Sequence, residues 1–191
     1  METTNSIIKR VKSIILTPKK EWEVIAAEES TAASVLMGYL LPLVIIVAIA
    51  NFIGYSIIGI NSPLGKIVGF GWGVRYAILT FANYIVGTFL TAYVISFLAP
   101  SFKGEKNYRK AFKLVVYSYT PILVAGLLYI IPALGILVLI AALYSIYELY
   151  LGIGLMTGVP KEKQTTFLIV SVVAMIVVYA LVSLVFTRII I

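Results

Sequence analysis

Five long apolar runs constrain this chain more than any other feature of its sequence. A helix needs ~20 mostly apolar residues to cross the hydrocarbon core of a bilayer, and each run supplies about that many. Only 12% of the residues are charged and 61% are hydrophobic, whereas a soluble domain has ~25% charged residues. The sequence therefore predicts an all-α membrane protein with five transmembrane helices, at residues 35–58, 74–99, 114–131, 134–156 and 166–187.

The basic residues between these runs predict the orientation of the helices. Twelve of the 15 Lys and Arg residues lie before the first run, between the second and third, or between the fourth and fifth. The other three are Lys66, Arg75 and Arg188. Lys and Arg accumulate on the cytoplasmic side of a membrane. We therefore expect a multi-pass protein of the inner (cytoplasmic) cell membrane, with the N-terminus in the cytoplasm and the C-terminus outside.

The segment before the first run, residues 1–34, is amphipathic and is expected to lie outside the five-helix domain formed by residues 35–191. In residues 6–16, aliphatic side chains share one helical face, and Lys9, Arg10 and Lys12 share the other. This pattern is typical of a helix that lies in the headgroup layer of a membrane. The segment is too short to span the bilayer, so we interpret it as a cytoplasmic, interfacial helix.

A second helix is predicted directly after the first. Thr17 and Pro18 fit the N-cap and the first position of a helix. This helix carries Trp22, whose amphipathic ring suits the boundary between lipid and water. We expect Trp22, together with the basic residues of the first helix, to anchor the segment at the interface. A docking surface for a cytoplasmic partner is the alternative.

Glu148 is the one acidic residue inside an apolar run. A charged side chain at the centre of a membrane helix costs roughly 2.5–3.5 kcal/mol on insertion scales, so Glu148 should face protein or water. Ser145 and Gly152 share its helical stripe, and small residues mark packed faces in membranes. Desolvation favours the protonated carboxyl group. Glu148 is either a hydrogen-bonded structural acid or a proton-binding or cation-binding group in a pathway.

Further polar side chains are expected at defined depths. If the third and fourth runs form a hairpin that turns at Pro132-Ala133, Tyr117 lies level with Glu148 and Thr120 lies one turn away, so both hydroxyl groups could reach the carboxyl group. In the first two runs, Asn51 and Asn83 are expected at similar depth. A hydrogen bond between them would contribute about 1 kcal/mol or less. The pair is interpreted as a packing contact or as part of a polar cavity.

The residue types that are missing exclude several kinds of chemistry. The chain has no Cys and no His, which excludes disulfides, thiol nucleophiles and imidazole bases and makes transition-metal sites unlikely candidates. We expect neither an enzyme nor a bound cofactor. The formal net charge of +7 favours contact with anionic lipids at the cytoplasmic face, and no nucleic-acid partner is expected.

Several motifs match a known family of membrane proteins. They are Pro18-x-x-x-Trp22-x-x-Ile25, Tyr117-Ser118-Tyr119-Thr120-Pro121, Ile131-Pro132-Ala133-Leu134-Gly135, and Tyr144-Ser145-x-Tyr147 followed by Gly152. With these motifs the chain resembles the Yip family, the Ypt/Rab-interacting membrane proteins, in its prokaryotic form. The resemblance implies a fold of five membrane-spanning helices with a cytoplasmic N-terminus. The Asp-Leu-Tyr-Gly-Pro motif of the eukaryotic members, which act in vesicle transport, is absent here.

Two functions are considered from these observations. We expect a non-enzymatic protein that organises the membrane or recruits a partner, either another membrane protein or a second copy of the chain. The alternative is a transporter or channel for a small solute, a proton or an ion. Its polar site would be formed by Glu148, Tyr117, Thr120, Ser145, Asn51 and Asn83. A dry, packed Glu148 would favour the first function, and a water-accessible one the second.

Overall fold

The computed structural model describes residues 2–63 and 65–190, with side chains described from Ser6 onward. In this part of the chain, five helical stretches are long and apolar enough to cross a membrane, which confirms the predicted fold class. They are Ala32–Ile58, Phe70–Phe102, Tyr108–Ile130, Pro132–Thr157 and Lys161–Ile190. Each begins a few residues before its apolar run, and two of them start at a polar cap. Thr31 and Asn107 accept hydrogen bonds from the backbone N–H groups of Ser34 and Lys110.

Most spans are continuous helices, but prolines interrupt two of them. The first consists of α3 (Ala32–Val35), a wide π-helical turn (Leu36–Leu40), α4 (Leu41–Ile53) and a second wide turn (Gly54–Ile58). Since Pro42 has no N–H group, the carbonyl of Gly38 loses its α-helical partner, and the helix widens directly before it. The second span is α5 (Phe70–Leu98), which continues as a 3₁₀ turn, Ala99–Phe102.

The third span breaks into α6 (Tyr108–Ser118), α7 (Thr120–Ala125) and a 3₁₀ turn, Gly126–Ile130. Pro121 cannot donate to the carbonyl of Tyr117, but the hydroxyl group of Thr120 donates to it instead, at 2.8 Å. A neighbouring hydroxyl thus satisfies the backbone group that the proline leaves free inside the membrane domain.

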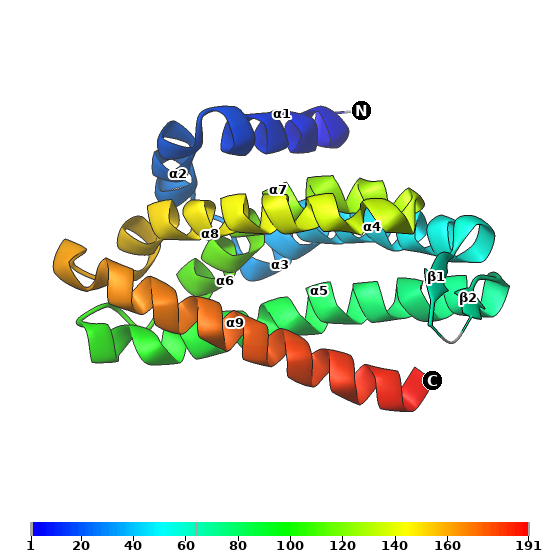
Figure 1. Cartoon of the computed structure of the whole chain (residues 1–191). Helices are drawn as coiled ribbons and strands as arrows, with labels where there is room; N and C mark the ends of the chain where they lie inside the picture. The colour runs from blue at the N-terminus through cyan, green and yellow to red at the C-terminus, as the bar shows by residue number, and fades with distance from the viewer. Residues whose placement is uncertain (1, 64, 191) are drawn as a thin grey trace.

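A tight turn around Pro132 leads from the third span into the fourth, as predicted. After the short 3₁₀ turn Pro132–Leu134, α8 (Gly135–Thr157) and α9 (Lys161–Ile190) complete the bundle. The first and second spans are joined by a small hairpin of β1 (Ile60–Ser62) and β2 (Gly65–Ile67), in which Ile60 pairs with Ile67. Figure 1 shows this hairpin at one end of the bundle, together with the C-terminal end of α9.

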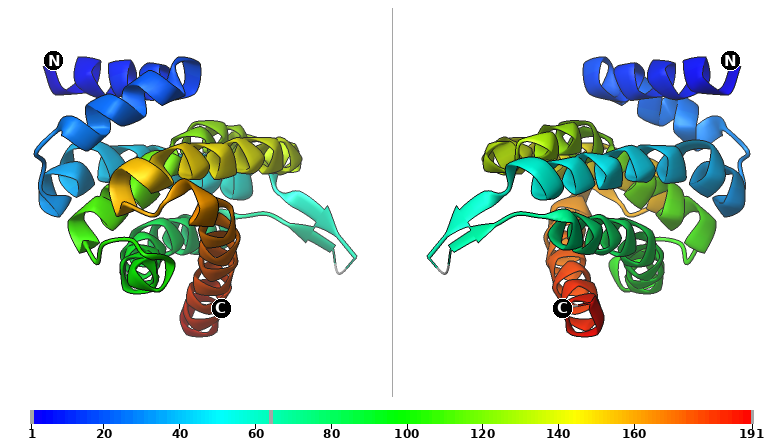
Figure 2. Two further views of the ribbon diagram at one scale, coloured as in Figure 1. Left: turned by 90° about the vertical axis from the view of Figure 1, so that its left-hand side faces the viewer. Right: turned by 90° about the vertical axis from the view of Figure 1, so that its right-hand side faces the viewer.

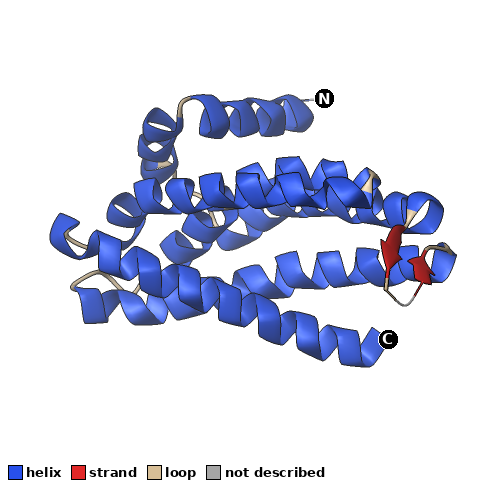
Figure 3. Cartoon of the chain, viewed as in Figure 1, coloured by secondary structure: helices blue, strands red, loops and turns tan. Residues whose placement is uncertain are grey.

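The opposite end of the bundle carries the connections from α5 to α6 and from α8 to α9 (Figures 1 and 3). These connections and the helical turns beside them hold Lys103, Lys106, Arg109, Lys110, Lys161 and Lys163. We call this end the basic end and the other the hairpin end. The arrangement places the predicted cationic segments together, at the same end as α2.

The helices differ greatly in how far they are covered. Every residue of α6 from Ala111 to Ser118 is buried, and α6 packs against α5 and α8. In α9, by contrast, the buried residues are Phe167, Ser171, Val178 and Val182. The third span is therefore the centre of the bundle, and α9 lies on its outside, along α5 and α8, with most of its apolar side chains left for lipid.

The N-terminal segment folds as α1 (Glu2–Leu16) and α2 (Pro18–Ala27). The prediction of a helix start at Pro18 is correct, but Thr17 does not cap it, since its hydroxyl group donates back to the carbonyl of Ser13. Figures 1 and 2 show both helices on the outside of the bundle. There α2 packs against α8 and α1 contacts α7.

Candidate functional site

Glu148 lies in the middle of the contact between α8 and α2. Its side chain is completely buried, and its Oε2 accepts a hydrogen bond from the indole nitrogen of Trp22, with 2.8 Å between Nε1 and Oε2. One turn further along α8, Gly152 leaves room for the ring. A methyl group in place of its hydrogen would lie 2.8 Å from the indole. Glu148 and Gly152 lie on one helical stripe and together form the site that holds the Trp22 ring. We call this site the seat of Trp22.

This seat is closed to solvent among the described residues. The second carboxyl oxygen, Oε1, has no hydrogen-bond partner there, and neither has the hydroxyl group of Ser145. Four cavities in the described part of the chain are all lined by residues other than Glu148. An unpaired buried polar atom costs free energy. The bond from Trp22 is therefore the one protein hydrogen bond that offsets the burial of this carboxyl group.

The structure places Trp22 differently from the prediction. It was expected at the boundary between lipid and water, but its side chain is 1% exposed and lies in the core. Two aromatic properties explain this position, because the large ring fills the space beside Gly152 while its single N–H group finds an acceptor in Glu148. Trp22 is a structural link between the N-terminal segment and the fourth span.

Tyr117 and Thr120 belong to a neighbouring cluster, not to the carboxyl group of Glu148. The hydroxyl groups of Thr120 and Tyr39 are hydrogen bonded at 2.8 Å, and the rings of Tyr39 and Tyr117 lie 4.9 Å apart, centre to centre. Across the described residues, no hydrogen bond joins Glu148 to Tyr117 or Thr120. They were expected to reach the carboxyl group of Glu148, but their side chains contact α1 and the first span.

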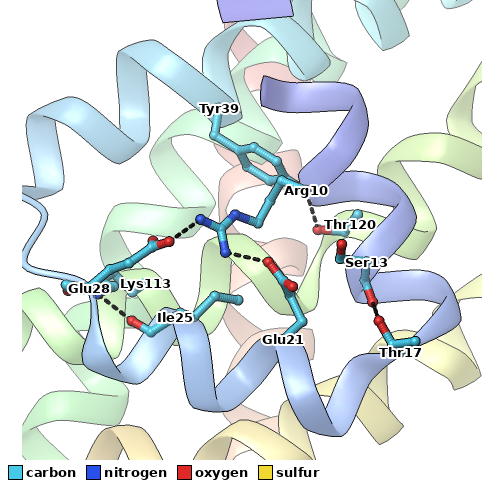
Figure 4. A network of polar contacts seen from close by, with 9 residues as sticks. All are labelled: Arg10, Ser13, Thr17, Glu21, Ile25, Glu28, Tyr39, Lys113 and Thr120. Carbon is cyan, nitrogen blue, oxygen red and sulfur yellow. Dashed lines mark hydrogen bonds and ion pairs between the residues drawn. The ribbon is translucent and has the colours of Figure 1, made fainter. Parts of the chain in front are cut away.

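Arg10 connects α1 to this cluster and to α2. Its guanidinium group forms ion pairs with Glu21 and Glu28 (Figure 4) and lies 5.7 Å from the centre of the Tyr117 ring. Burial opposes its charge, but the hydrogen bond to Glu28 and the nearby negative charges outweigh burial, so the pKa of Arg10 is raised. Arg10 is therefore a half-buried fork between two acids. The sequence had predicted Lys9, Arg10 and Lys12 as interfacial anchors. Of these three residues, only Lys9 and Lys12 are exposed.

Lys113 caps the C-terminal end of α2. Its ammonium group donates to the backbone carbonyls of Ile25 and Glu28, each at 2.7 Å. These carbonyls belong to the last turn of α2 and the residue after it, where a helix lacks its own donors and carries partial negative charge. Lys113 is 4% exposed. A cation of the most buried helix thus holds the C-terminal end of the N-terminal segment.

Asn51 and Asn83 lie in the walls of a separate cavity of about 640 Å³ near the hairpin end. Each amide nitrogen donates to a carbonyl of its own helix, that of Val47 or Leu79. The amide oxygen of Asn83 accepts from the hydroxyl group of Ser183 at 3.0 Å, which links α5 to α9. No hydrogen bond joins the two Asn residues in the described structure, although both face the same cavity.

Two contacts of the N-terminal segment could not be read from the sequence. Glu21 and Glu28 are seven residues apart, about two helical turns, and that spacing was the available signal for a shared cation, although α2 ends before Glu28. For the seat of Trp22, the signal was the smallness of Gly152 beside Glu148. Neither signal identifies the partner residue, which is Arg10 for the two acids and Trp22 for Glu148. As for a metal, the described residues contain no group of three or more His, Cys, Asp or Glu side chains that could hold one.

Comparison with known proteins identifies the family. No solved structure matches the chain. The inner membrane protein YohC of Escherichia coli K12 is 28% identical over 155 residues, which cover 78% of this chain and 80% of YohC. YohC of Escherichia coli O6:H1 matches equally well. The model of the Yip1 domain matches residues 12–184, nearly the whole described bundle together with α2. This chain therefore belongs to the Yip1 domain family of membrane proteins.

Proposed function

We propose that this protein is a non-enzymatic membrane protein that recruits an acidic partner, or organises anionic lipid, through the surface of α1 and α2. The observation that carries the proposal is how the charges of the segment are divided. Arg10, Glu21 and Glu28 pair with one another, whereas, beside the exposed Glu23, four lysines of the same two helices are exposed. These are Lys9, Lys12, Lys19 and Lys20.

The N-terminal segment that carries these lysines is also held in a fixed position on the bundle. Hydrogen bonds from Trp22, Lys113 and Tyr144 tie α1 and α2 to the spans, so the exposed lysines hold set positions on the bundle. A rigid basic surface loses little conformational freedom when it binds. Each cation near an anionic surface contributes about 1 kcal/mol, which favours anionic headgroups or the acidic face of another membrane protein.

The proposal is tested with the full-length protein in nanodiscs of uncharged lipid, by co-flotation with vesicles that contain phosphatidylglycerol. Replacement of Lys9 and Lys12 by Gln should weaken this binding about 30-fold, because two cations are lost. The matched control replaces Lys66 and Arg188, two exposed cations of the hairpin end, and should bind as the wild type does. Equal binding by the two double variants contradicts the proposal, provided that a pull-down from native membranes also recovers no acidic protein partner.

Transport through the site of Glu148 is the competing function. The packed seat of Trp22 weighs against it, because a transported ion or proton needs a path that reaches the carboxyl group. Proteoliposomes give a direct test. A proton or ion flux that depends on the protein and changes in the Glu148→Gln variant would favour transport over recruitment, whereas equal flux with and without protein removes the transport hypothesis.

A further inference from the structure

The cavity near the hairpin end is largely apolar, and the polar groups in its walls are uncharged among the described residues. Its volume is about 640 Å³, within the range of sites for small ligands. None of the described residues that line it carries a charged side chain, although five tyrosines and several amide and hydroxyl side chains do line it. It lies between α4, α5, α8 and α9, at the opposite end of the bundle from α2, so it is separate from the surface that the proposed function uses.

Tyrosine side chains gather on one side of this cavity. The rings of Tyr55 and Tyr76 are stacked, with 3.6 Å between their centres. Tyr129 and Tyr179 also line the cavity. These four residues come from four different spans. Aromatic hydroxyl groups can both donate and accept, so the cavity offers a cluster of uncharged hydrogen-bonding groups.

Asn51 adds an unused acceptor. Its side chain is 4% exposed and lines the cavity. The amide nitrogen donates to the carbonyl of Val47, but among the described residues the amide oxygen has no hydrogen-bond partner. Asn83, by contrast, uses both ends of its amide, on Leu79 and Ser183. An amide oxygen in the wall of the cavity that has no protein donor is available to a ligand hydroxyl group.

The edges of the cavity point to where a ligand enters. Leu139 of α8 and Ile176 and Tyr179 of α9 line the cavity and are each more than half exposed. These positions belong to membrane-spanning stretches, so the exposed side chains face lipid. A molecule that passes between α8 and α9 would come from the bilayer and could leave its alkyl chains there.

We propose that this cavity binds the head of an uncharged lipid with a free hydroxyl group, of the diacylglycerol class. Its hydroxyl group would donate to the amide oxygen of Asn51, and its ester carbonyl groups would accept hydrogen bonds from the tyrosine hydroxyl groups, while its chains remain between α8 and α9. A phosphate head would bring a charge into a cavity that offers no cation, which is costly. The chemistry of the lining therefore selects neutral over anionic lipids.

Photo-crosslinking tests this inference on the full-length protein in liposomes. A diacylglycerol that carries its photoreactive group near the head is compared with a phosphatidylglycerol that has the same chains and the same group. The diacylglycerol probe should label peptides of α4 or α9 that line the cavity, and at least tenfold more strongly than the anionic probe. Equal labelling by both probes, or labelling by diacylglycerol elsewhere on the chain, would overturn the assignment.

Variants separate specific binding from general lipid contact. Asn51→Leu removes the free acceptor at similar size and should reduce the labelling about fivefold, the loss of one hydrogen bond. Ala142→Phe fills the cavity from α8, so labelling should fall even if Asn51→Leu does not fold. The control is Ser171→Ala, which removes a buried hydroxyl group of α9 outside the cavity and should leave labelling unchanged. Unchanged labelling in every folded cavity variant refutes the proposal.

Discussion

The two polar regions of this bundle differ in charge and in access. At the basic end, Arg10, Lys113 and three acids are buried or half-buried. Their side chains form ion pairs and hydrogen bonds within the protein. At the hairpin end the cavity walls hold amides and hydroxyl groups without any charge, and the space between them is open. Buried charge here serves to attach a segment, and neutral polar groups leave room for a ligand. If this division is correct, variants at the basic end should lower stability more than those at the hairpin end.

The largest effect is expected for Trp22→Ala. It removes a fully buried ring and leaves Glu148 without its donor, so the free energy of unfolding should fall by about 3–5 kcal/mol. Thermal unfolding in detergent measures the loss, and limited proteolysis after residue 28 should show α1 and α2 detached. Trp22→Phe keeps most of the packing and should cost about 1–3 kcal/mol, the penalty for an unpaired carboxyl group. Wild-type stability of Trp22→Ala would show that the seat is not the attachment point.

Arg10→Ala should have the next largest effect. It leaves Glu21 and Glu28 without their cation, and because these groups are half-buried we expect a loss of about 1–3 kcal/mol. Arg10→Lys should recover only part of it, since one ammonium group cannot form the fork that reaches both acids. Chemical unfolding of the three proteins side by side gives the comparison, and equal stability of the Lys variant and the wild type would argue against the fork.

The contact of Arg10 with Glu21 and Glu28 also predicts how the stability depends on pH. The pKa of Arg10 is raised in the folded protein. A group with a raised pKa contributes its full stabilisation below its unfolded pKa and loses it only as the pH rises through the folded value. For an arginine that loss requires strongly alkaline solution. The difference in stability between wild type and Arg10→Ala should therefore be the same at pH 7 and pH 9, and a decrease over this interval would contradict the assignment.

Gly152→Ala tests the seat of Trp22 from the other side. The added methyl group would lie 2.6 Å from Leu114 and 2.8 Å from the indole, and such overpacking costs about 1–3 kcal/mol. Gly87→Ala is the matched control, because a methyl group there meets nothing within 4 Å. That substitution should stabilise the protein by about 0.4–1 kcal/mol through the unfolded chain. In thermal unfolding, we expect Gly152→Ala to lower the midpoint temperature and Gly87→Ala to raise it. Equal stability of the two variants would contradict the packing of Trp22 against Gly152.

The smallest effect is expected at the hairpin end. Ser183→Ala removes the hydrogen bond to Asn83 between α9 and α5, and such bonds in membranes contribute about 0.6 kcal/mol on average. The same unfolding assay checks this value. A loss as large as that of Trp22→Ala would break the comparison between the two ends, since it would make the neutral cavity as important for stability as the buried charges.

The spans could be predicted from the sequence because the signal is local. Length, apolarity and the distribution of Lys and Arg locate each helix without knowledge of its neighbours. Asn51 and Asn83 were also expected at similar depth, and both line one cavity. The surroundings of Trp22 could not be predicted, because its acceptor lies 126 residues away. For Arg10, the helical pattern gives the face but not the element that covers it.

The capping of α2 by Lys113 has a consequence for biosynthesis. Residues 18–27 leave the ribosome well before α6, and longer still before the part of α8 that supplies Glu148. The segment that is synthesised first can therefore reach its final position only after the third and fourth spans have been inserted. Until then its carbonyls and its indole must be satisfied by water or headgroups, so the beginning of the chain cannot become native before the fourth span is in place.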